Sequence, residues 1–206
     1  VDIYGASKVL VETMIQMLAE AHSFQWTILV PHNCFGEHQS LSDRYRNVIG
    51  IFLNSVLRHE PLYLYGKDHV RAFSYMGDCL PAFTKAAELH PKLNRELINI
   101  GGIEPVTIKE VAEEVIKNFP EYPYPEIIEL PPRHGEVKAA YCTGDRSIKL
   151  LDFKETIKWR EGLKRMALWA KAVGPSPWKQ ESLAIPTEDI PLPWREIQKG
   201  HIVSSR

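Results

Sequence analysis

The stretch YGASKVLVETMIQMLAEA (residues 4–21) is followed by the apolar run WTILV (residues 26–30). Apolar side chains recur in the first stretch about every 3.6 residues, which predicts an amphipathic helix. The second stretch is short, continuously apolar and ended by a proline, a pattern that fits a strand buried on both faces of a parallel sheet. Because helix and strand patterns alternate from here on, the sequence predicts an α/β fold.

The rest of the sequence supplies the alternating patterns. Periodic stretches predict helices at residues 47–59, 78–89, 106–119 and 161–173. Short apolar stretches predict strands at residues 62–66, 71–76, 96–101 and 122–132. Asp78 is expected to cap the helix that follows it, with Pro81 in the first turn. Thr107 and Glu110 have the spacing of a capping box.

The composition is that of an ordinary globular protein, with 206 residues, 44% hydrophobic, 25% charged and a net charge of −1. A nearly neutral chain has no overall field that attracts nucleic acid or an anionic membrane. No apolar run approaches the roughly 18 residues of a membrane helix, and no signal-peptide pattern is present. The three cysteines are scattered without metal-ligand spacing and indicate a reducing compartment. We therefore expect a cytoplasmic protein without a metal, nucleic-acid or membrane partner.

The first helix has an apolar face that needs a sheet to lie on, yet few parallel-strand patterns follow it. A sheet of two parallel strands would leave much of that face in water. We therefore expect the sequence to be incomplete at its N-terminus.

Tyr4 and Lys8 lie four residues apart on this helix. Side chains at that spacing are neighbours, with about 5–6 Å between their Cβ atoms. An ammonium beside a phenol favours the phenolate, which is a base. A phenol has a pKa near 10 in water, so a base active at neutral pH needs about 4 kcal/mol of phenolate stabilisation. The small residues 5–7 leave room for a flat group against the backbone.

Chance also explains the spacing, because Tyr63 and Lys67 repeat it. They lie in and just after a predicted strand, where four residues span about 13 Å and the side chains cannot support each other. Position on a helix therefore favours Tyr4 and Lys8 as a catalytic pair, without excluding an accidental one.

The segments YGASKVLVE (4–12) and TILVPHNCFGEHQ (27–39) together resemble the extended short-chain dehydrogenase/reductase family. Within it they are most similar to the nucleotide-sugar epimerases and dehydratases, a group that includes UDP-glucose 4-epimerase. That group has a Y-x-x-x-K pair followed by (R)-x-x-N-x-(Y/F)-G-P. Here the second motif reads VPHNCFGE (30–37), with Val30 in place of arginine and Glu37 in place of proline. The resemblance extends to about residue 172.

The resemblance implies the C-terminal part of a Rossmann-type parallel sheet with a small α/β substrate-binding domain. The expected domains are an NAD-binding remnant at residues 1–31 and 78–101, a substrate-binding domain at 32–77 and 102–173, and a Pro-rich tail at 174–206. The sequence has no G-x-x-G-x-x-G, and NIGGIEP (99–105) lacks its spacing. The strands that hold most of the dinucleotide are therefore expected upstream of residue 1.

The resemblance also implies NAD as cofactor and a nucleotide sugar, most simply a UDP-sugar, as substrate. Tyr4 would take the proton of the sugar 4-hydroxyl, and re-reduction of the 4-keto sugar on its other face would invert C4. Lys8 would also bind the nicotinamide ribose, with Pro31 and His32 on the cofactor side, although His32 is equally well explained as structural. Dehydration and decarboxylation would begin with the same oxidation, and a nucleotide-sugar reductase of the same family is another alternative. A catalytically inactive fragment that only binds nucleotide sugar is a further alternative.

The resemblance assigns eight residues to the substrate: Asn33, Asn47, Val48, Tyr63, Tyr65, Arg71, Arg133 and Glu136. Amide and guanidinium groups would bind the diphosphate, the two tyrosines uracil, and the glutamate the ribose. Ala72 replaces the aspartate that usually follows the first of these arginines.

Each substrate residue also has a structural explanation. Asn33 is also explained as a loop residue whose side chain bonds its own backbone, and Asn47 as a plain helix N-cap. The arginines fit solvated surface charges, and the tyrosines fit one packed face of a strand. His69 and His134 are expected to be exposed loop residues. The first helix fits either a homodimer interface or packing on a sheet.

Overall fold

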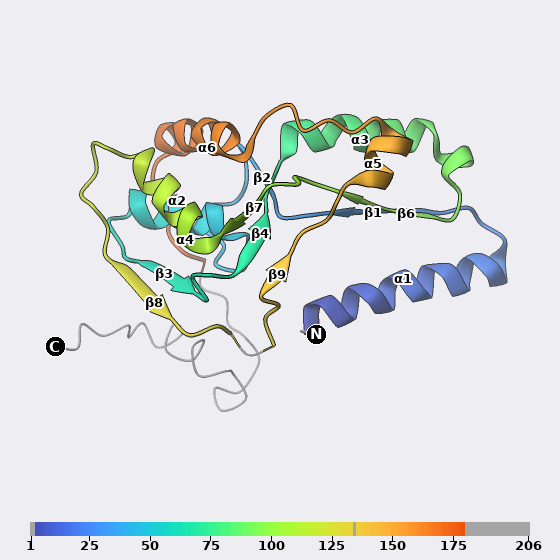
Figure 1. Ribbon diagram of the computed structural model, residues 1–206, viewed down its shortest axis with the longest axis horizontal. Helices are drawn as coiled ribbons and strands as arrows, with labels where there is room; N and C mark the ends of the chain where they lie inside the picture. The colour runs from blue at the N-terminus through green and yellow to red at the C-terminus, as the bar shows by residue number, and fades with distance from the viewer. Residues whose placement is uncertain (1–2, 134, 180–206) are drawn as a thin grey trace.

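The computed structural model describes residues 3–133 and 135–179 of the chain. The fold is α/β with parallel strand pairs, which confirms the predicted class. Figure 1 shows helices α2, α4 and α6 gathered at one end of the molecule. At the other end, a long strand pair, β1 and β6, lies between helices α3 and α1.

The long strand pair consists of β1 (Thr27–Pro31) and β6 (Glu96–Ile100), which run parallel with Thr27 opposite Glu96. Helix α3 (Met76–Glu88) and the short helix α5 (Asp145–Leu151) cover one face of the pair, and the 3-10 helix His90–Leu93 leads into β6. Buried side chains of β6, α3 and α5 form one hydrophobic cluster, which includes Ile98, Ile100, Cys79, Ala82 and Leu151.

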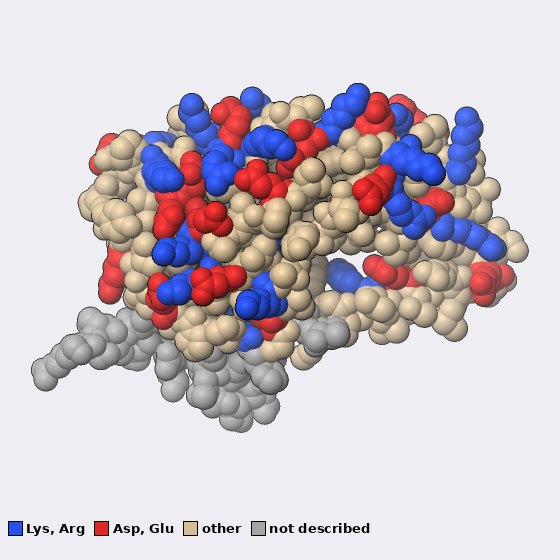
Figure 2. All heavy atoms as spheres, viewed as in Figure 1, with Lys and Arg blue, Asp and Glu red and all other residues tan. Residues whose placement is uncertain are grey.

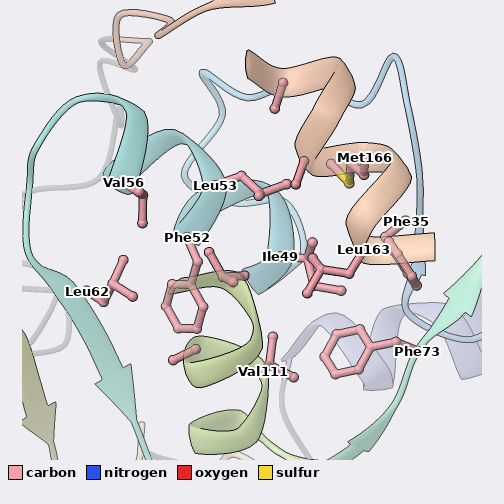
Figure 3. Packing of buried hydrophobic residues seen from close by; sticks show 14 of the residues in the cluster. Phe35, Ile49, Phe52, Leu53, Val56, Leu62, Phe73, Val111, Leu163 and Met166 are labelled. Atoms are coloured by element: carbon pink, nitrogen blue, oxygen red, sulfur yellow. The ribbon is translucent and has the colours of Figure 1, made fainter. Parts of the chain in front are cut away.

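The larger hydrophobic cluster lies between α2 (Val48–Leu57), α4 (Ile108–Lys117) and α6 (Trp159–Val173). Figure 3 shows Phe52 and Leu53 of α2 pointing toward Val111 and Leu163 of the other two helices. The parallel pair β3 (Leu62–Tyr65) and β8 (Ile127–Leu130) flanks these helices, with Leu62 contributing to the same core. Helical periodicity predicted all three helices: α4 and α6 each bury one apolar face, and α2 is buried over most of its length.

Short strands join the two clusters. Strand β2 (Cys34–Phe35) pairs in parallel with β5 (Ser74–Tyr75). Strand β4 (Val70–Ala72) lies between β7 (Pro105–Thr107), which is antiparallel to it, and β9 (Ala139–Ala140), which is parallel. The predicted strand at 71–76 is thus two short strands, and Met76 already belongs to α3.

Helix α1 (Ile3–His22) forms where the sequence predicted it, but its apolar face is uncovered. Only Ala19 is buried among its residues. Side chains from one end of the helix to the other are exposed: Ile3, Tyr4, Val9, Leu10, Val11, Met14, Met17 and Leu18. Figure 2 shows an opening between α1 and the body of the molecule. A cavity of about 220 Å³ lies at the C-terminal half of α1, lined in part by Gln16, Trp26 and Arg95.

Strand β1 is consequently half-buried, so the expectation of a strand buried on both faces was wrong. Within the described residues it pairs with β6 alone, and α1 does not cover its second face closely.

The two predicted helix starts have different outcomes. Thr107 and Glu110 form the expected capping box at the start of α4. The expectation for α3 was wrong, since Tyr75 is its N-cap and Asp78 lies inside the first turn. Pro81 falls within the helix, beyond that turn. Asp78 is instead buried and accepts hydrogen bonds from Thr156 Oγ1 and from the backbone N–H of Ile157.

The division into two domains stays a prediction. The two hydrophobic clusters fit it in outline, although Leu151 and Phe153, expected in the substrate-binding domain, pack with Ile98 and Ile100. Most of the expected tail, residues 180–206, lies outside the described residues.

Candidate functional site

Tyr4 and Lys8 share one face near the start of α1. The Lys8 ammonium lies 5.1 Å from the centre of the Tyr4 ring. The tyrosine side chain is 71% exposed, and Ser7 Oγ donates a hydrogen bond to its backbone carbonyl. Within residues 3–133 and 135–179, Lys8 makes no ion pair with an acidic side chain. Both functional groups are therefore open to a ligand.

Pro31, His32 and Asn33 lie at the carboxyl end of β1. The backbone N–H of His32 donates to the Ile100 carbonyl and extends the β1–β6 ladder by one bond. Its ring Nε2 lies 3.4 Å from Asn99 Oδ1. In open α/β sheets, ligands bind outside the carboxyl ends of parallel strands, so these residues are at the edge where a cofactor is expected.

Asn33 adopts a left-handed backbone conformation with φ of 39°, which asparagine tolerates better than most residues. Its side-chain amide donates to the Ala72 carbonyl at 2.9 Å. The side chain thus ties the loop after β1 to β4, the strand that carries Arg71.

Asn47 is the N-cap of α2. Its Oδ1 accepts from the backbone N–H of Ile49 at 3.1 Å. Its Nδ2 donates to the Cys34 carbonyl and to Gln39 Oε1. This geometry matches the plain-cap explanation of Asn47. Val48 opens the helix, where unpaired backbone N–H groups and the helix dipole favour an anion.

Arg71 and Glu136 form an ion pair, with 3.2 Å between Nη2 and Oε1. Arg71 Nη1 also donates to the backbone carbonyl of Val70 at 2.8 Å. His69 lies on the other side of the carboxylate, with 3.8 Å between Nδ1 and Oε2. Within the described residues, neither of those two buried atoms has a hydrogen-bond partner. The expectation that His69 is exposed was therefore wrong, since it is only 7% exposed.

Arg133 lies over the ring of Tyr65, with its guanidinium carbon 4.4 Å from the ring centre. Along β3, Tyr63 and Tyr65 are half-buried on one face, while Leu62 and Leu64 are buried on the other. Burial, together with the nearby carboxylates of Glu126 and Glu60, raises the pKa of the Tyr63 phenol.

Lys67 forms an ion pair with Glu129, with 2.7 Å between Nζ and Oε2. Its ammonium is therefore engaged away from Tyr63, the partner that the spacing alone suggested.

The structure brings four of the predicted residues into one polar cluster: Tyr65, Arg71, Arg133 and Glu136. The Glu136 backbone N–H donates to the Arg133 carbonyl, which links the two pairs. Asn33 borders this cluster, because its side chain donates to the backbone of Ala72, the residue after Arg71. Asn47 is linked to the same segment, because its side chain donates to the backbone carbonyl of Cys34, the residue after Asn33. Within the part of the chain that the structure describes, no hydrogen bond or ion pair joins Tyr4 or Lys8 to it.

Two polar residues at the site escaped the sequence analysis. His69 faces Glu136, and Gln39 accepts a hydrogen bond from Asn47. A turn at Gly66, whose φ is 55°, brings the His69 ring back against it, and a turn-forming glycine before a strand is the one local signal of that packing.

Residues 3–133 and 135–179 contain neither a metal-ligand cluster nor a membrane helix. No three or more His, Cys, Asp or Glu side chains lie together as metal ligands. No helix there is long and apolar enough to span a membrane.

The sequence profile of the NAD dependent epimerase/dehydratase family matches residues 1–101, which contain the Tyr4–Lys8 pair and both asparagines. The N-terminal half of the chain, up to residue 101, therefore belongs to this family. The match ends with β6, so Arg133 and Glu136 lie outside it.

The curated relatives that the chain resembles differ from one another in activity. The chain is 31% identical over 113 residues to a dTDP-4-dehydro-6-deoxyglucose reductase of Escherichia coli, which covers 54% of this chain and 35% of the relative. It is 27% identical over 192 residues to a UDP-N-acetyl-alpha-D-glucosaminuronate decarboxylase of Bacillus cytotoxicus, a match that covers 83% of this chain and 57% of the relative. It is 24% identical over 169 residues to a dTDP-L-rhamnose 4-epimerase of Burkholderia thailandensis, a match that covers 82% of this chain and 46% of the relative.

Solved structures confirm the Rossmann-like α/β fold. The UDP-glucose 4-epimerase of Thermotoga maritima with UDP-glucose superposes with a TM-score of 0.74 at 24% identity, over 82% of this chain and 53% of that one. The UDP-glucuronic acid 4-epimerase of Bacillus cereus, in complex with UDP-glucuronic acid and NAD, superposes with a TM-score of 0.74 at 22% sequence identity. This match covers 82% of this chain and 52% of that one. The chain thus spans about half the length of the proteins that it matches.

Proposed function

We propose that the chain is part of an NAD-dependent enzyme that oxidises a nucleotide sugar at C4 and re-reduces it with inversion, a nucleotide-sugar 4-epimerase. The observation that carries the proposal is the shared face of Tyr4 and Lys8 on α1, with 5.1 Å between ammonium and ring centre. Family membership supports the assignment, because this pair lies within the matched residues.

The residues present fit the nicotinamide end of NAD. The Tyr4 hydroxyl and the Lys8 ammonium are exposed on one face and are not consumed by an ion pair within the described residues. The residues between them, 5–7, are small enough for a flat ring to approach the helix. Bound NAD would supply the hydride acceptor. Pro31 and His32, at the carboxyl end of β1, would lie on the cofactor side.

The polar cluster supports a nucleotide-sugar substrate. Arg71 and Arg133 offer guanidinium groups, whose planar geometry matches phosphate oxygens. Tyr65 and Tyr63 offer aromatic surface on one face of β3, suited to a base such as uracil. Asn33 and the start of α2 at Val48 add donors for the diphosphate, and Glu136 an acceptor for a ribose hydroxyl.

In the proposed reaction, Tyr4 accepts the proton of the sugar 4-hydroxyl and later returns it. The Lys8 ammonium lies on the same helix face and places a positive charge beside the phenolate that forms in this step. The arginines hold the diphosphate while the oxidised sugar turns over and presents its opposite face. Inversion therefore requires that the nucleotide stays bound while the oxidised sugar is free to rotate in the site.

Decarboxylation is the second candidate. It shares the first oxidation, and the decarboxylase relative aligns over 83% of this chain. Dehydration, reduction and binding without turnover remain further outcomes of the same test. A homodimer and a cytoplasmic location are also proposals, consistent with the exposed apolar face of α1 and with the scattered cysteines.

The test uses the full-length protein that contains this chain, with NAD and either UDP-glucose or UDP-glucuronic acid. We expect a 4-epimer by chromatography, whereas release of carbon dioxide from the uronic acid would identify a decarboxylase. Substituting Tyr4→Phe should lower turnover by at least about 100-fold, because it removes the general base. Tyr124→Phe is the matched control, since that side chain is 73% exposed and belongs neither to the Tyr4–Lys8 pair nor to the polar cluster. Unchanged turnover in the Tyr4 variant would overturn the proposal.

A further inference from the structure

Cys34 and Cys79 are in direct contact although 45 residues separate them in sequence. Their sulfur atoms lie 3.8 Å apart, one on β2 and the other on α3. Cys79 is fully buried, while Cys34 is half-buried at the edge of the same hydrophobic cluster. The proposed reaction uses neither thiol.

We propose that Cys34 and Cys79 form a redox-modification site, at which a small disulfide such as glutathione disulfide is exchanged for an internal Cys34–Cys79 disulfide. In a reducing compartment, disulfides of this kind are transient and serve as sensors. The site goes beyond the proposed function, because it requires neither NAD nor a nucleotide sugar.

The positions of the sulfurs favour closure. A disulfide bond is about 2.05 Å long, so the two sulfurs have to approach by less than 2 Å. Strand β2 and helix α3 already pack against each other, and the two thiols are in direct hydrogen-bond contact. The required movement is within reach of side-chain rotation and a small backbone shift.

The two thiols differ in a way that sets the order of reaction. The hydrogen bond between the sulfurs lowers the pKa of Cys34, the less buried of the two cysteines. The same contact, with burial and the nearby Asp78 carboxylate, raises the pKa of Cys79. Cys34 is therefore the first nucleophile and Cys79 the resolving thiol.

The exchange balances in two steps. The Cys34 thiolate attacks one sulfur of glutathione disulfide, forms a mixed disulfide and releases one glutathione thiolate. Cys79 then loses its proton, attacks the Cys34 sulfur and releases the second glutathione. Two protein thiols are oxidised and one small disulfide is reduced to two thiols.

Closure would act on the segment that holds the candidate site. Cys34 directly follows Asn33, and its carbonyl accepts a hydrogen bond from Asn47. An internal disulfide would fasten this segment to α3 and hold both asparagines in one position. Oxidation therefore links the redox state to the part of the fold that positions them.

The experiment treats the native full-length protein with glutathione disulfide, blocks remaining thiols with N-ethylmaleimide, and measures mass and tryptic peptides. The three cysteines of this chain fall in separate tryptic peptides, at 9–44, 72–85 and 139–146. We expect a protein about 2 Da lighter before blocking, since two hydrogens are lost. Peptides 9–44 and 72–85 should be joined, while Cys142 should be alkylated and reduction should restore all thiols.

Three variants separate this outcome from others. Cys79→Ala should stop at a stable glutathione adduct on Cys34, whereas Cys34→Ser should leave Cys79 unreacted in the folded protein. Cys142→Ser, the matched control, should form the same internal disulfide as the unmodified sequence. Circular dichroism checks that each variant is folded, and the peptide map of the unmodified sequence needs no variant.

The proposal is overturned if all three cysteines remain alkylatable in the folded protein under conditions that oxidise a small dithiol. It is also overturned if the joined peptides include 139–146, or if Cys34 stops at the glutathione adduct while Cys79 is present. None of these outcomes depends on catalytic activity, so failure here is distinct from failure of the proposed function.

Discussion

At the scale of single residues, the carboxylate of Glu136 lies between two basic side chains, Arg71 and His69. The sequence motifs indicated Arg71 and Glu136 separately, as substrate residues, but not their pairing, which the fold alone creates. They did not indicate His69, since nothing local shows that the chain near residue 136 folds over it. Buried polar contacts between distant segments are the part of a site that motifs do not encode.

Removing the Arg71 guanidinium should weaken nucleotide binding. Arg71→Ala removes a cation proposed to bind the diphosphate and takes the ion-pair partner from Glu136, which faces the same ligand. We expect UDP affinity, measured by calorimetry on the full-length protein, to fall by about 10-fold or more, because hydrogen bonds to charged groups contribute about 1.5–3 kcal/mol. Arg146→Ala, at a surface ion pair with Glu96, is the control and should leave the affinity unchanged. Equal affinities in both variants would contradict the assignment.

At the scale of elements, local signals predicted the helices and strands that bury one apolar face. The capping box of α4 was predictable because both partners lie within one turn. The role of Asp78 was not, because its partners, Thr156 and Ile157, are far along the chain. The two-residue strands β2 and β9 were also missed, since they are too short to show a period.

The start of α4 should make stability depend on pH. Hydrogen bonds from Thr107 lower the pKa of Glu110 in the folded chain. Its stabilising contribution is therefore complete above the unfolded pKa of about 4.3 and is lost as pH falls through the folded value. Glu110→Ala should cost about 1 kcal/mol at pH 7, the usual effect of losing a cap, and much less at about pH 3.

Urea unfolding at both pH values measures this difference. Glu113→Ala is the matched control, on the same helix and paired only at 3.9 Å with Lys109. A destabilisation of the Glu110 variant that is the same at both pH values would rule out the charged cap.

Asp78 should matter more than its position on α3 suggests. Asp78→Ala removes the acceptor of two hydrogen bonds and leaves the Ile157 N–H without its partner. We expect a loss of about 2–3 kcal/mol in the free energy of unfolding, measured with urea. Glu88→Ala, at the exposed end of the same helix, should change it by less than about 0.5 kcal/mol. Similar losses in both variants would show that the two bonds contribute little.

At the scale of the whole molecule, the α/β class could be recognised from the alternation of helix and strand patterns, and the family from two short segments. The packing of α1 could not be predicted, because the apolar periodicity of a helix does not indicate which element covers its apolar face. The sequence indicated a helix that needs a sheet, and the structure shows that helix largely exposed along its apolar side. The placement of Tyr4 relative to the polar cluster depends on that same packing, so the site could be predicted only in its parts.

Exposure of α1 should appear in its dynamics. Only Ala19 of this helix is buried, whereas α2 is buried over most of its length. In the polypeptide of the printed sequence, we expect backbone amides of α1 to exchange hydrogen at least about 100-fold faster than those of α2, because local opening needs little loss of apolar contact. Hydrogen–deuterium exchange with mass spectrometry measures both helices together. Equal protection would mean that α1 is covered in solution.

The segment after α6 has a practical consequence for choosing where to end an expressed polypeptide. Asn54 is fully buried in α2, and both ends of its amide bond the backbone of Ser176, at 3.0 and 2.9 Å. Two residues further, Trp178 donates to Glu60. A stop codon placed at the end of α6 would remove these partners and leave a buried amide unpaired, at a cost of about 1–3 kcal/mol. Shortened versions of the protein should therefore keep the chain at least through residue 179.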